Sequence, residues 1–165
     1  MLSPTQPCPC GSLKTFNDCC LIIHNNHASA STAEQLMRAR YSAFVVANID
    51  FLIKSHLDIV DSAQEREQIK ASTTLAWCKL EIINASKQDT NDISFVEFKA
   101  WYIENETLQP LHENSRFIRK AINNHRCWFY VDGTFPAAPE NKQTIARNAP
   151  CPCNSGKKFK RCCAN

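Results

Sequence analysis

The pattern of apolar and polar positions predicts helices in the first half of the chain. Ser31 and Glu34 form a capping-box pattern, and the apolar residues that follow recur at helical spacing over 33–47. The polar stretch 21–32 before this helix is predicted to be a linker. Two further caps predict short helices that end near residues 55 and 71: Asn48, and the capping box of Ser62 with Glu65.

The second half of the chain is rich in β-branched and aromatic residues and predicts strands. Turn-forming residues, including the cluster 89–92, separate four such runs: 77–86, 93–104, 108–120 and 126–131. Helices followed by antiparallel strands are typical of an α+β domain. A helix packed on one face of a curved antiparallel sheet would form a cone with an internal pocket.

An internal repeat relates the two ends of the chain. Residues 7–20 read PCPCGSLKTFNDCC and residues 150–163 read PCPCNSGKKFKRCC, with nine of the fourteen positions identical. Both copies have the spacing C-x-C-x₈-C-C and together hold eight of the 10 cysteines. Turn-forming residues follow the first cysteine pair of each copy, so the chain can double back and bring the two pairs together.

Four thiols in this arrangement match a structural zinc site, which takes four tetrahedral ligands. Each segment is too short to bury a core, so metal binding would supply its folding energy, and Phe16 and Phe159 would shield the metal. Disulfides, free thiols and an iron–sulfur cluster are the alternatives, but adjacent cysteines rarely bridge without strain. At the first site, His24 or His27 could replace one thiolate. The predicted ligands of the two zinc ions are Cys8, Cys10, Cys19 and Cys20, and Cys151, Cys153, Cys162 and Cys163.

These residues resemble the SEC-C motif, the zinc-binding motif in the C-terminal tail of the SecA translocation ATPase. In that motif the fourth ligand is His or Cys, and both copies here have Cys. The resemblance implies partners like those of the SecA motif, namely the SecB chaperone, ribosomes and lipid surfaces. Four basic residues of the C-terminal copy match the motif: Lys157, Lys158, Lys160 and Arg161. The N-terminal copy departs from it at Leu13, Thr15, Asn17 and Asp18, so a shared partner for the two ends is not implied.

The middle of the chain is similar to the YchJ family of bacterial proteins. The similarity is carried by EQLMRARYSAFVVANIDFLIKSH, VEFKAWY, LHENSRFIRK and WFYVDG. It implies a SEC-C motif at each end of a central domain with the nuclear transport factor 2-like (cystatin-like) fold. The expected organisation is a zinc motif over 1–27, a central domain over 28–135, and a linker with the second zinc motif over 136–165. The central domain would have its own core, which chelation would spare.

Charge is unevenly distributed along the chain. The formal net charge is +3, and two zinc sites of four thiolates would change it to about −1, so the protein is not strongly basic. Residues 140–165 nevertheless carry six basic residues and one acidic residue. The four cations of the second motif predict a surface for an anionic partner, unless they are only a solvated face. The expected function is therefore that of a binding or adaptor protein.

The predicted cone suggests an alternative function, that of an enzyme or small-ligand carrier. Alternate residues along its strands mix aromatic rings with carboxylates, as in a pocket with a few polar anchors. A carboxylate buried there could act as a general base, although pairing with Arg38 or Arg40 would make the cluster an ion-pair network. No nucleophile, phosphate-loop or dinucleotide motif is present, and no catalytic residue is predicted. The predicted pocket residues are Glu97, Glu113, Ser115, Phe117, Trp128, Tyr130 and Asp132.

A cytosolic location is expected. The first ten residues have neither a charged n-region nor an apolar h-region, so no secretory signal is visible. The longest uncharged apolar run, 41–49, is too short to cross a bilayer. In the cytosol, clustered cysteines are more often metal ligands than disulfides.

Overall fold

Helices occupy the first half of the chain and a sheet the second half, as the sequence predicts. The computed structural model describes residues 2–86, 91–122, 125–136, 143–153 and 155–164. The helices are α1 (Cys20–Asn25), α2 (Ala33–Val46), α3 (Ile49–Lys54) and α4 (Ala63–Thr73), with 3-10 turns η1 (His27–Ser29) and η2 (Phe159–Arg161). The strands are β1 (Ala76–Ala85), β2 (Ile93–Glu104), β3 (Thr107–Ile122), β4 (His125–Thr134) and β5 (Gln143–Thr144).

Side-chain caps set the starts of α2, α3 and α4. Asn48 and Ser62 cap α3 and α4 as predicted, each accepting a hydrogen bond from a backbone N–H in the first turn. At α2 the cap lies one residue later than predicted. The Thr32 side chain accepts from the N–H of Gln35, and Gln35 Oε1 accepts in return from the N–H of Ser31. The reciprocal pair is thus built on Thr32 and Gln35.

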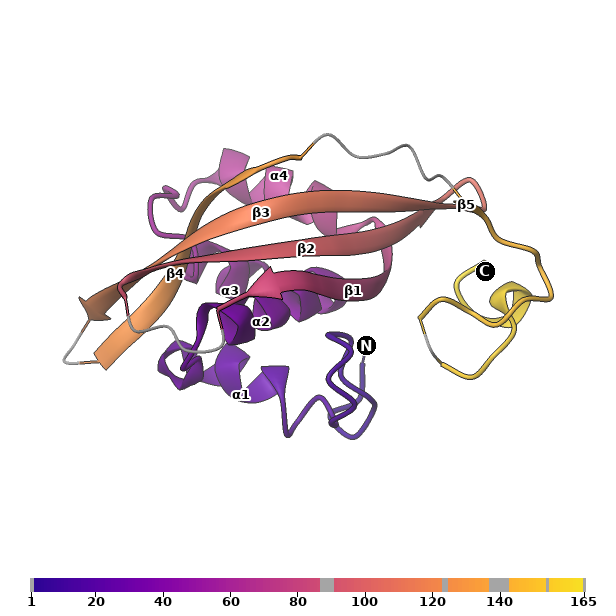
Figure 1. The fold of residues 1–165 in the computed structure, drawn as a ribbon, viewed down its shortest axis with the longest axis horizontal. Coiled ribbons are helices and arrows are strands. Elements are labelled where there is room, and N and C mark those ends of the chain that lie inside the picture. Colours follow the sequence, from indigo (N-terminus) through magenta and orange to yellow (C-terminus); the bar gives the residue numbers. More distant parts are fainter. Residues whose placement is uncertain (1, 87–90, 123–124, 137–142, 154, 165) are drawn as a thin grey trace.

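The sheet is antiparallel in the order β1-β2-β3-β4, and β5 pairs with the first residues of β3, beyond the end of β4. The helices cover one face of this curved sheet, with α2 lying along β1, β2 and β4 (Figure 1). This confirms the predicted α+β architecture. The core lies between α2 and the sheet, and its largest fully buried side chains include Leu36, Tyr41, Leu52, Val96, Phe117 and Trp128.

Other segments partly cover the two outer strands of the sheet. At β4, Tyr130 donates its backbone N–H to the Ser55 carbonyl (3.0 Å), and its carbonyl accepts from the N–H of Leu57 (2.8 Å). At β1, the N-terminal repeat comes so close that a Cβ on Gly11 would lie 3.9 Å from the Leu80 carbonyl oxygen. Both edges of the sheet therefore have a neighbour formed by the same chain.

The predicted linker at 21–32 is wrong, because this segment forms α1 and η1 and is docked on the core. His24 Nε2 lies 2.9 Å from the carbonyl oxygen of Ala39 in α2, and His27 Nε2 lies 2.6 Å from the carbonyl oxygen of Trp128 in β4. Burial lowers the pKa of both histidines. As neutral rings, they satisfy backbone carbonyls that water would otherwise hydrate.

The remaining predictions concern membrane-spanning helices, the segments that connect the elements, and the two cysteines outside the repeats. No helix in the described ranges is long and apolar enough to span a membrane. The predicted turn cluster at 89–92 and the exit before the second repeat lie partly outside the described residues, at 89–90 and 137–142. Cys78 and Cys127, the two cysteines outside the repeats, are buried in strands.

Candidate metal centres and central cavity

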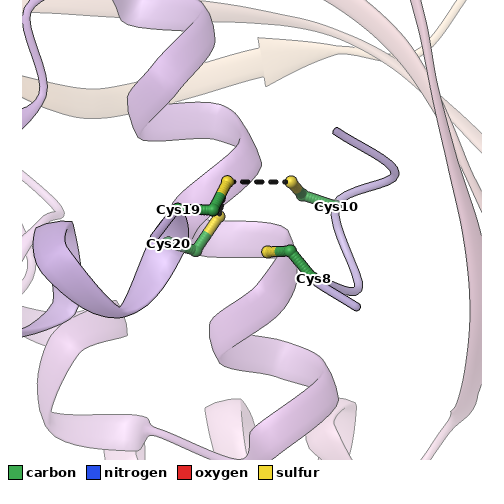
Figure 2. A group of neighbouring side chains, drawn as sticks. All are labelled: Cys8, Cys10, Cys19 and Cys20. Carbon is green, nitrogen blue, oxygen red and sulfur yellow. Dashed lines mark hydrogen bonds between the residues drawn. The ribbon is translucent and has the colours of Figure 1, made fainter. Parts of the chain in front are cut away.

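The first candidate metal centre lies between the N-terminal loop and the start of α1. Cys8 and Cys10 are on the loop, Cys19 immediately precedes α1 and Cys20 is its first residue. Figure 2 shows the four side chains converging on one point. All four sulfur atoms lie within 4.8 Å of one another, with Cys10 Sγ 3.6 Å and Cys20 Sγ 3.8 Å from Cys19 Sγ.

A tight backbone hairpin brings the two cysteine pairs together. The N–H of Cys8 donates to the Lys14 carbonyl (2.8 Å), and the N–H of Phe16 donates to the Gln6 carbonyl (2.9 Å). Gly11 has a φ of 76°, in the left-handed region that glycine adopts without a steric cost, directly after the first cysteine pair. The reversal therefore follows from the turn residues that the sequence places there.

The C-terminal repeat folds in the same way. The N–H of Cys151 donates to the Lys157 carbonyl (2.9 Å), and the N–H of Phe159 donates to the Ala149 carbonyl (2.8 Å), in the same repeat positions as the first hairpin. Sequence identity between the repeats is thus matched by an equivalent set of backbone bonds. The second group of sulfur atoms within 4.8 Å of one another belongs to Cys151, Cys153, Cys162 and Cys163.

A serine contacts the third cysteine of each centre. Ser12 Oγ is 3.1 Å from Cys19 Sγ, and Ser155 Oγ is 3.2 Å from Cys162 Sγ. The two serines occupy the same repeat position. A hydroxyl that donates to the sulfur stabilises the thiolate form, which is the form that binds a metal.

The spacing of the sulfur atoms fits zinc. Tetrahedral ligands at a Zn–S distance of 2.3 Å are about 3.8 Å apart. The observed distances are 3.6 and 3.8 Å around Cys19, and 3.5 and 3.9 Å from Cys162 to Cys153 and Cys163; Cys151 and Cys153 are closer, at 3.3 Å. All eight cysteines are free thiols. Hydrogen bonds from Cys20 and Cys8 lower the pKa of Cys10, and the same contacts raise the pKa of Cys8 and Cys20, so the group shares its protons until a cation displaces them.

His24 and His27 do not replace a thiolate at the first centre. Their Nε2 atoms lie against the carbonyls of Ala39 and Trp128, whereas Cys20 lies within the group of converging sulfurs. Four thiols are therefore the donor set at both ends.

The two centres differ in their relation to the core. Cys8, Cys10 and Cys20 are buried and belong to the same hydrophobic cluster as α2 and the sheet. Arg38 in α2 also donates to the Cys10 carbonyl (2.8 Å) and pairs with Glu34. In the second centre only Cys151 is buried, and none of its cysteines belongs to that cluster. The first centre is thus built into the domain, and the second is peripheral to it.

The cationic face of the second motif is accessible. Lys157, Lys158 and Arg161 are exposed, and Lys160 is partly exposed. Within the described part of the chain, none of the four forms an ion pair. In contrast, the first motif carries Lys14 and also Asp18, which accepts a hydrogen bond from a neighbouring threonine.

A cavity of about 340 Å³ lies between α2 and the inner face of the sheet. It runs from Ser72 and Leu75, exposed at the end of α4, to a polar end formed by buried Arg40, Glu113 and Ser115. Tyr130 also lines it. The remaining walls are mostly apolar: Met37, Tyr41, Phe44, Trp77, Phe98, Ala100, Tyr102 and Leu111.

Glu113 is at the centre of the polar end. Its Oε1 accepts hydrogen bonds from Ser115 Oγ (2.7 Å) and from the Tyr130 hydroxyl (3.0 Å). Arg40 lies over the Tyr130 ring, 4.7 Å from its centroid, and donates to the Leu52 carbonyl (2.8 Å). Burial lowers the pKa of Arg40 to about 10, so its guanidinium remains charged at neutral pH.

Only three of the seven predicted pocket residues line the cavity, namely Glu113, Ser115 and Tyr130. The prediction is wrong for Asp132, which forms an exposed ion pair with Arg116 on the other face. A β-bulge between β3 and β4 causes this: Tyr130 pairs with Phe117, but Asp132 pairs with the preceding residue, Arg116. The extra residue, Val131, breaks the alternation of side chains along β4.

The other predicted pocket residues also lie elsewhere. Glu97 is on the outer face of β2, where its Oε1 is 2.8 Å from His112 Nε2. Phe117 and Trp128 do face the helices, but they are fully buried in the core and do not line the cavity. From the sequence pattern alone, an inward-facing residue that packs in the core cannot be distinguished from one that lines a pocket.

Two residues of the polar end are not among the seven predicted pocket residues: the sequence suggests Arg40 only as an ion-pair partner of the carboxylates, and it does not suggest Gly133. Arg40 lies three and four positions after Met37 and Leu36, a spacing that places it on the apolar face of α2. Gly133 leaves room for the acid, because a Cβ there would overlap Glu113 Oε1. It is the one glycine outside the two repeats, which is a signal of close approach.

Comparison with known proteins matches the central domain and both repeats. The family model described as YchJ, middle NTF2-like domain matches residues 32–133, and the SEC-C motif matches 5–21 and 147–165. A UPF0225 protein from Vibrio parahaemolyticus is 42% identical, covering 94% of this chain and 97% of the relative. One from Photorhabdus laumondii is also 42% identical, covering 96% and 99%.

Solved structures show the same arrangement. The crystal structure of a SEC-C motif containing protein from Psychrobacter arcticus is 31% identical, with a TM-score of 0.68 over 99% of this chain and 98% of the other. The solution structure of a SEC-C motif containing protein from Rhodopseudomonas palustris is 25% identical, with a TM-score of 0.62 over 79% and 99%.

Proposed function

Because this chain belongs to the YchJ family and carries a SEC-C motif at each end, we propose that it is a zinc-binding adaptor protein. The first zinc has a structural role in the domain, and the second holds a cationic surface that binds an anionic partner. The single observation that carries the proposal is the difference between the centres. Their sulfur geometry is equivalent, but one centre is buried in the core, and the other belongs to a motif whose four cations form no ion pair with any described residue.

The electrostatics of the two motifs support different roles. A zinc ion with four thiolates has a net charge of −2, which four cations convert to about +2 at the second motif. At the first motif, Lys14 and Asp18 cancel, so the charge stays near −2. A nucleic acid, a ribosome, an acidic chaperone or lipid headgroups would be attracted to the second motif and repelled by the first.

The purified full-length chain is expected to contain two zinc ions, because each group of four sulfurs fits one tetrahedral ion. Elemental analysis of untagged protein measures this directly. The Cys20→Ser and Cys163→Ser variants should each contain about one zinc ion. One zinc ion or none in wild-type protein with intact thiols would contradict the assignment.

Partner binding is expected to depend on the cations of the second motif and to weaken with salt. Replacing Lys157, Lys158, Lys160 and Arg161 together with serine should reduce binding at least about tenfold, because several charge contacts are lost at once. The measurement is sedimentation with ribosomes, flotation with anionic vesicles, and capture of proteins from lysate, each over a range of ionic strength.

A matched variant controls for charge alone. It replaces four exposed lysines of the central domain, which should leave binding nearly unchanged: Lys54, Lys70, Lys79 and Lys120. Zinc content should stay at the wild-type value in both variants. Equal loss of binding in both, or salt-insensitive binding in wild-type protein, would refute the adaptor role without affecting the zinc assignment.

A further inference from the structure

We propose that the cavity of the central domain is a binding site for a small, uncharged, mostly apolar molecule with one hydrogen-bond donor, which Glu113 accepts. The site is separate from both metal centres and independent of the adaptor role. Its volume of about 340 Å³ lies in the range of small-molecule sites, which are mostly apolar with a few fixed polar groups.

The polar end is built to accept one more hydrogen bond. Both bonds that hold Glu113, from Ser115 and Tyr130, go to the same oxygen, Oε1. Among the described residues, the second oxygen, Oε2, has no hydrogen-bond partner. Glu113 is only 7% exposed and lines the cavity. Oε2 is not among the buried atoms that lack a partner, so it is open to the cavity, where a donor on a bound molecule can replace the water that would otherwise hydrate it.

The carboxylate is held in place by its surroundings. Ser115 and Tyr130 fix Oε1, and the lack of a side chain at Gly133 provides the space that the carboxylate occupies. Such fixed geometry lowers the entropy lost when a ligand binds.

The charges at the polar end select against an ionic ligand. Buried Arg40 and Glu113 contribute one positive and one negative charge to the same end of the cavity. Because these two charges balance, neither an anion nor a cation gains a net attraction that offsets the cost of its own desolvation in the cavity. A neutral hydroxyl or N–H has a much smaller desolvation cost.

The apolar walls accommodate the body of the ligand. Trp77, Tyr102 and Phe44 line the outer part, and Phe98 and Ala100 line the inner part. Trp77 is held by a hydrogen bond from its Nε1 to the Ser72 carbonyl (2.9 Å), which links the sheet to the end of α4 at the mouth. An aromatic ring fits walls of this composition.

Two probes of nearly equal shape test the proposal on the zinc-loaded full chain. 4-Methylphenol has a hydroxyl donor where 1,4-dimethylbenzene has a methyl group. NMR titration of backbone amides should show saturable 1:1 binding of both, with shifts at cavity-lining residues. 4-Methylphenol should bind about tenfold more tightly, because it donates to a charged acceptor. 4-Methylbenzoate and benzylammonium should bind more weakly than 4-methylphenol.

Variants locate the effect. Glu113→Gln should reduce the preference for 4-methylphenol to less than about threefold, since a neutral acceptor forms a weaker hydrogen bond. Glu97→Gln is the matched control on the outer face and should leave the preference unchanged. Ala100→Leu should abolish binding of both probes by filling the cavity.

Three results would overturn the proposal: no saturable binding to folded wild-type protein, equal affinity for the two probes, or equal effects of Glu113→Gln and Glu97→Gln. If Glu113→Gln does not fold, the ratio of the two wild-type affinities and the location of the shifts still decide the question.

Discussion

Cys20→Ser is expected to lower the free energy of unfolding of the central domain by about 3 kcal/mol or more, whereas Cys163→Ser should change it by less than about 0.5 kcal/mol. The two cysteines occupy the same repeat position, so the chemical change is identical. The difference arises from location. Cys20 begins α1 and belongs to the main hydrophobic cluster, whereas Cys163 is half-buried and lies outside that cluster.

Loss of the first metal would remove more than one ligand contact. The hairpin that carries Cys10 is bonded to α2 through Arg38, and α1 contributes buried Ile23 to the core. The expectation from sequence, that chelation would spare the central domain, is therefore replaced by one in which only the second motif unfolds alone.

Tryptophan fluorescence during denaturant unfolding measures this effect. The three tryptophans lie in β1, β2 and β4, so they report on the central sheet and not on either repeat. Elemental analysis confirms that each variant has lost one zinc ion. Equal changes in unfolding free energy for Cys20→Ser and Cys163→Ser would show that the first motif is as independent as the second.

Gly133→Ala is expected to destabilise the protein by about 2–3 kcal/mol, because the new Cβ would displace the Glu113 carboxylate. Displacement would break the hydrogen bonds that Glu113 accepts from Ser115 and Tyr130. In a Glu113→Ala background the clash is absent, so the same substitution should cost less than about 1 kcal/mol.

A double-mutant cycle measured by denaturant unfolding tests this interaction. The coupling between positions 113 and 133 should be at least about 1 kcal/mol and favourable in the double variant. Additive effects would mean that the backbone moves to accommodate the methyl group, and that Gly133 does not position the acid.

The elements with strong periodicity were predictable from the sequence, and the small docked ones were not. The four strands and the helices after Thr32, Asn48 and Ser62 have apolar spacing or caps that depend only on neighbouring residues. In contrast, α1 has only six residues, too few to be stable alone, and forms because His24 bonds to α2. Tertiary contacts of this kind produce no periodic pattern in the neighbouring sequence, so they could not be predicted from it.

The convergence of four cysteines at each end was predictable in full, but the cavity was predictable only in part. The type and spacing of the cysteines indicate a metal site directly, and both repeats have the same spacing. The face on which Asp132 lies depends instead on the β-bulge at Val131. No residue type in this stretch predicts a bulge. The outer position of Glu97 follows from alternation in β2, because its neighbours Val96 and Phe98 face the core; the pocket prediction for Glu97 did not apply this alternation.

The position of the N-terminal repeat beside β1 has a consequence for self-association. An open strand at the edge of a sheet is a template for a strand of another molecule. At β4 the backbone groups of Tyr130 are bonded to Ser55 and Leu57, and at β1 Gly11 of the N-terminal hairpin lies beside the Leu80 carbonyl. Without metal, the N-terminal hairpin would no longer cover β1, whereas the segment with Ser55 and Leu57 would still cover β4. Zinc-starved protein would then have one open edge per molecule, so pairing of β1 with β1 would form a closed dimer and not a longer assembly.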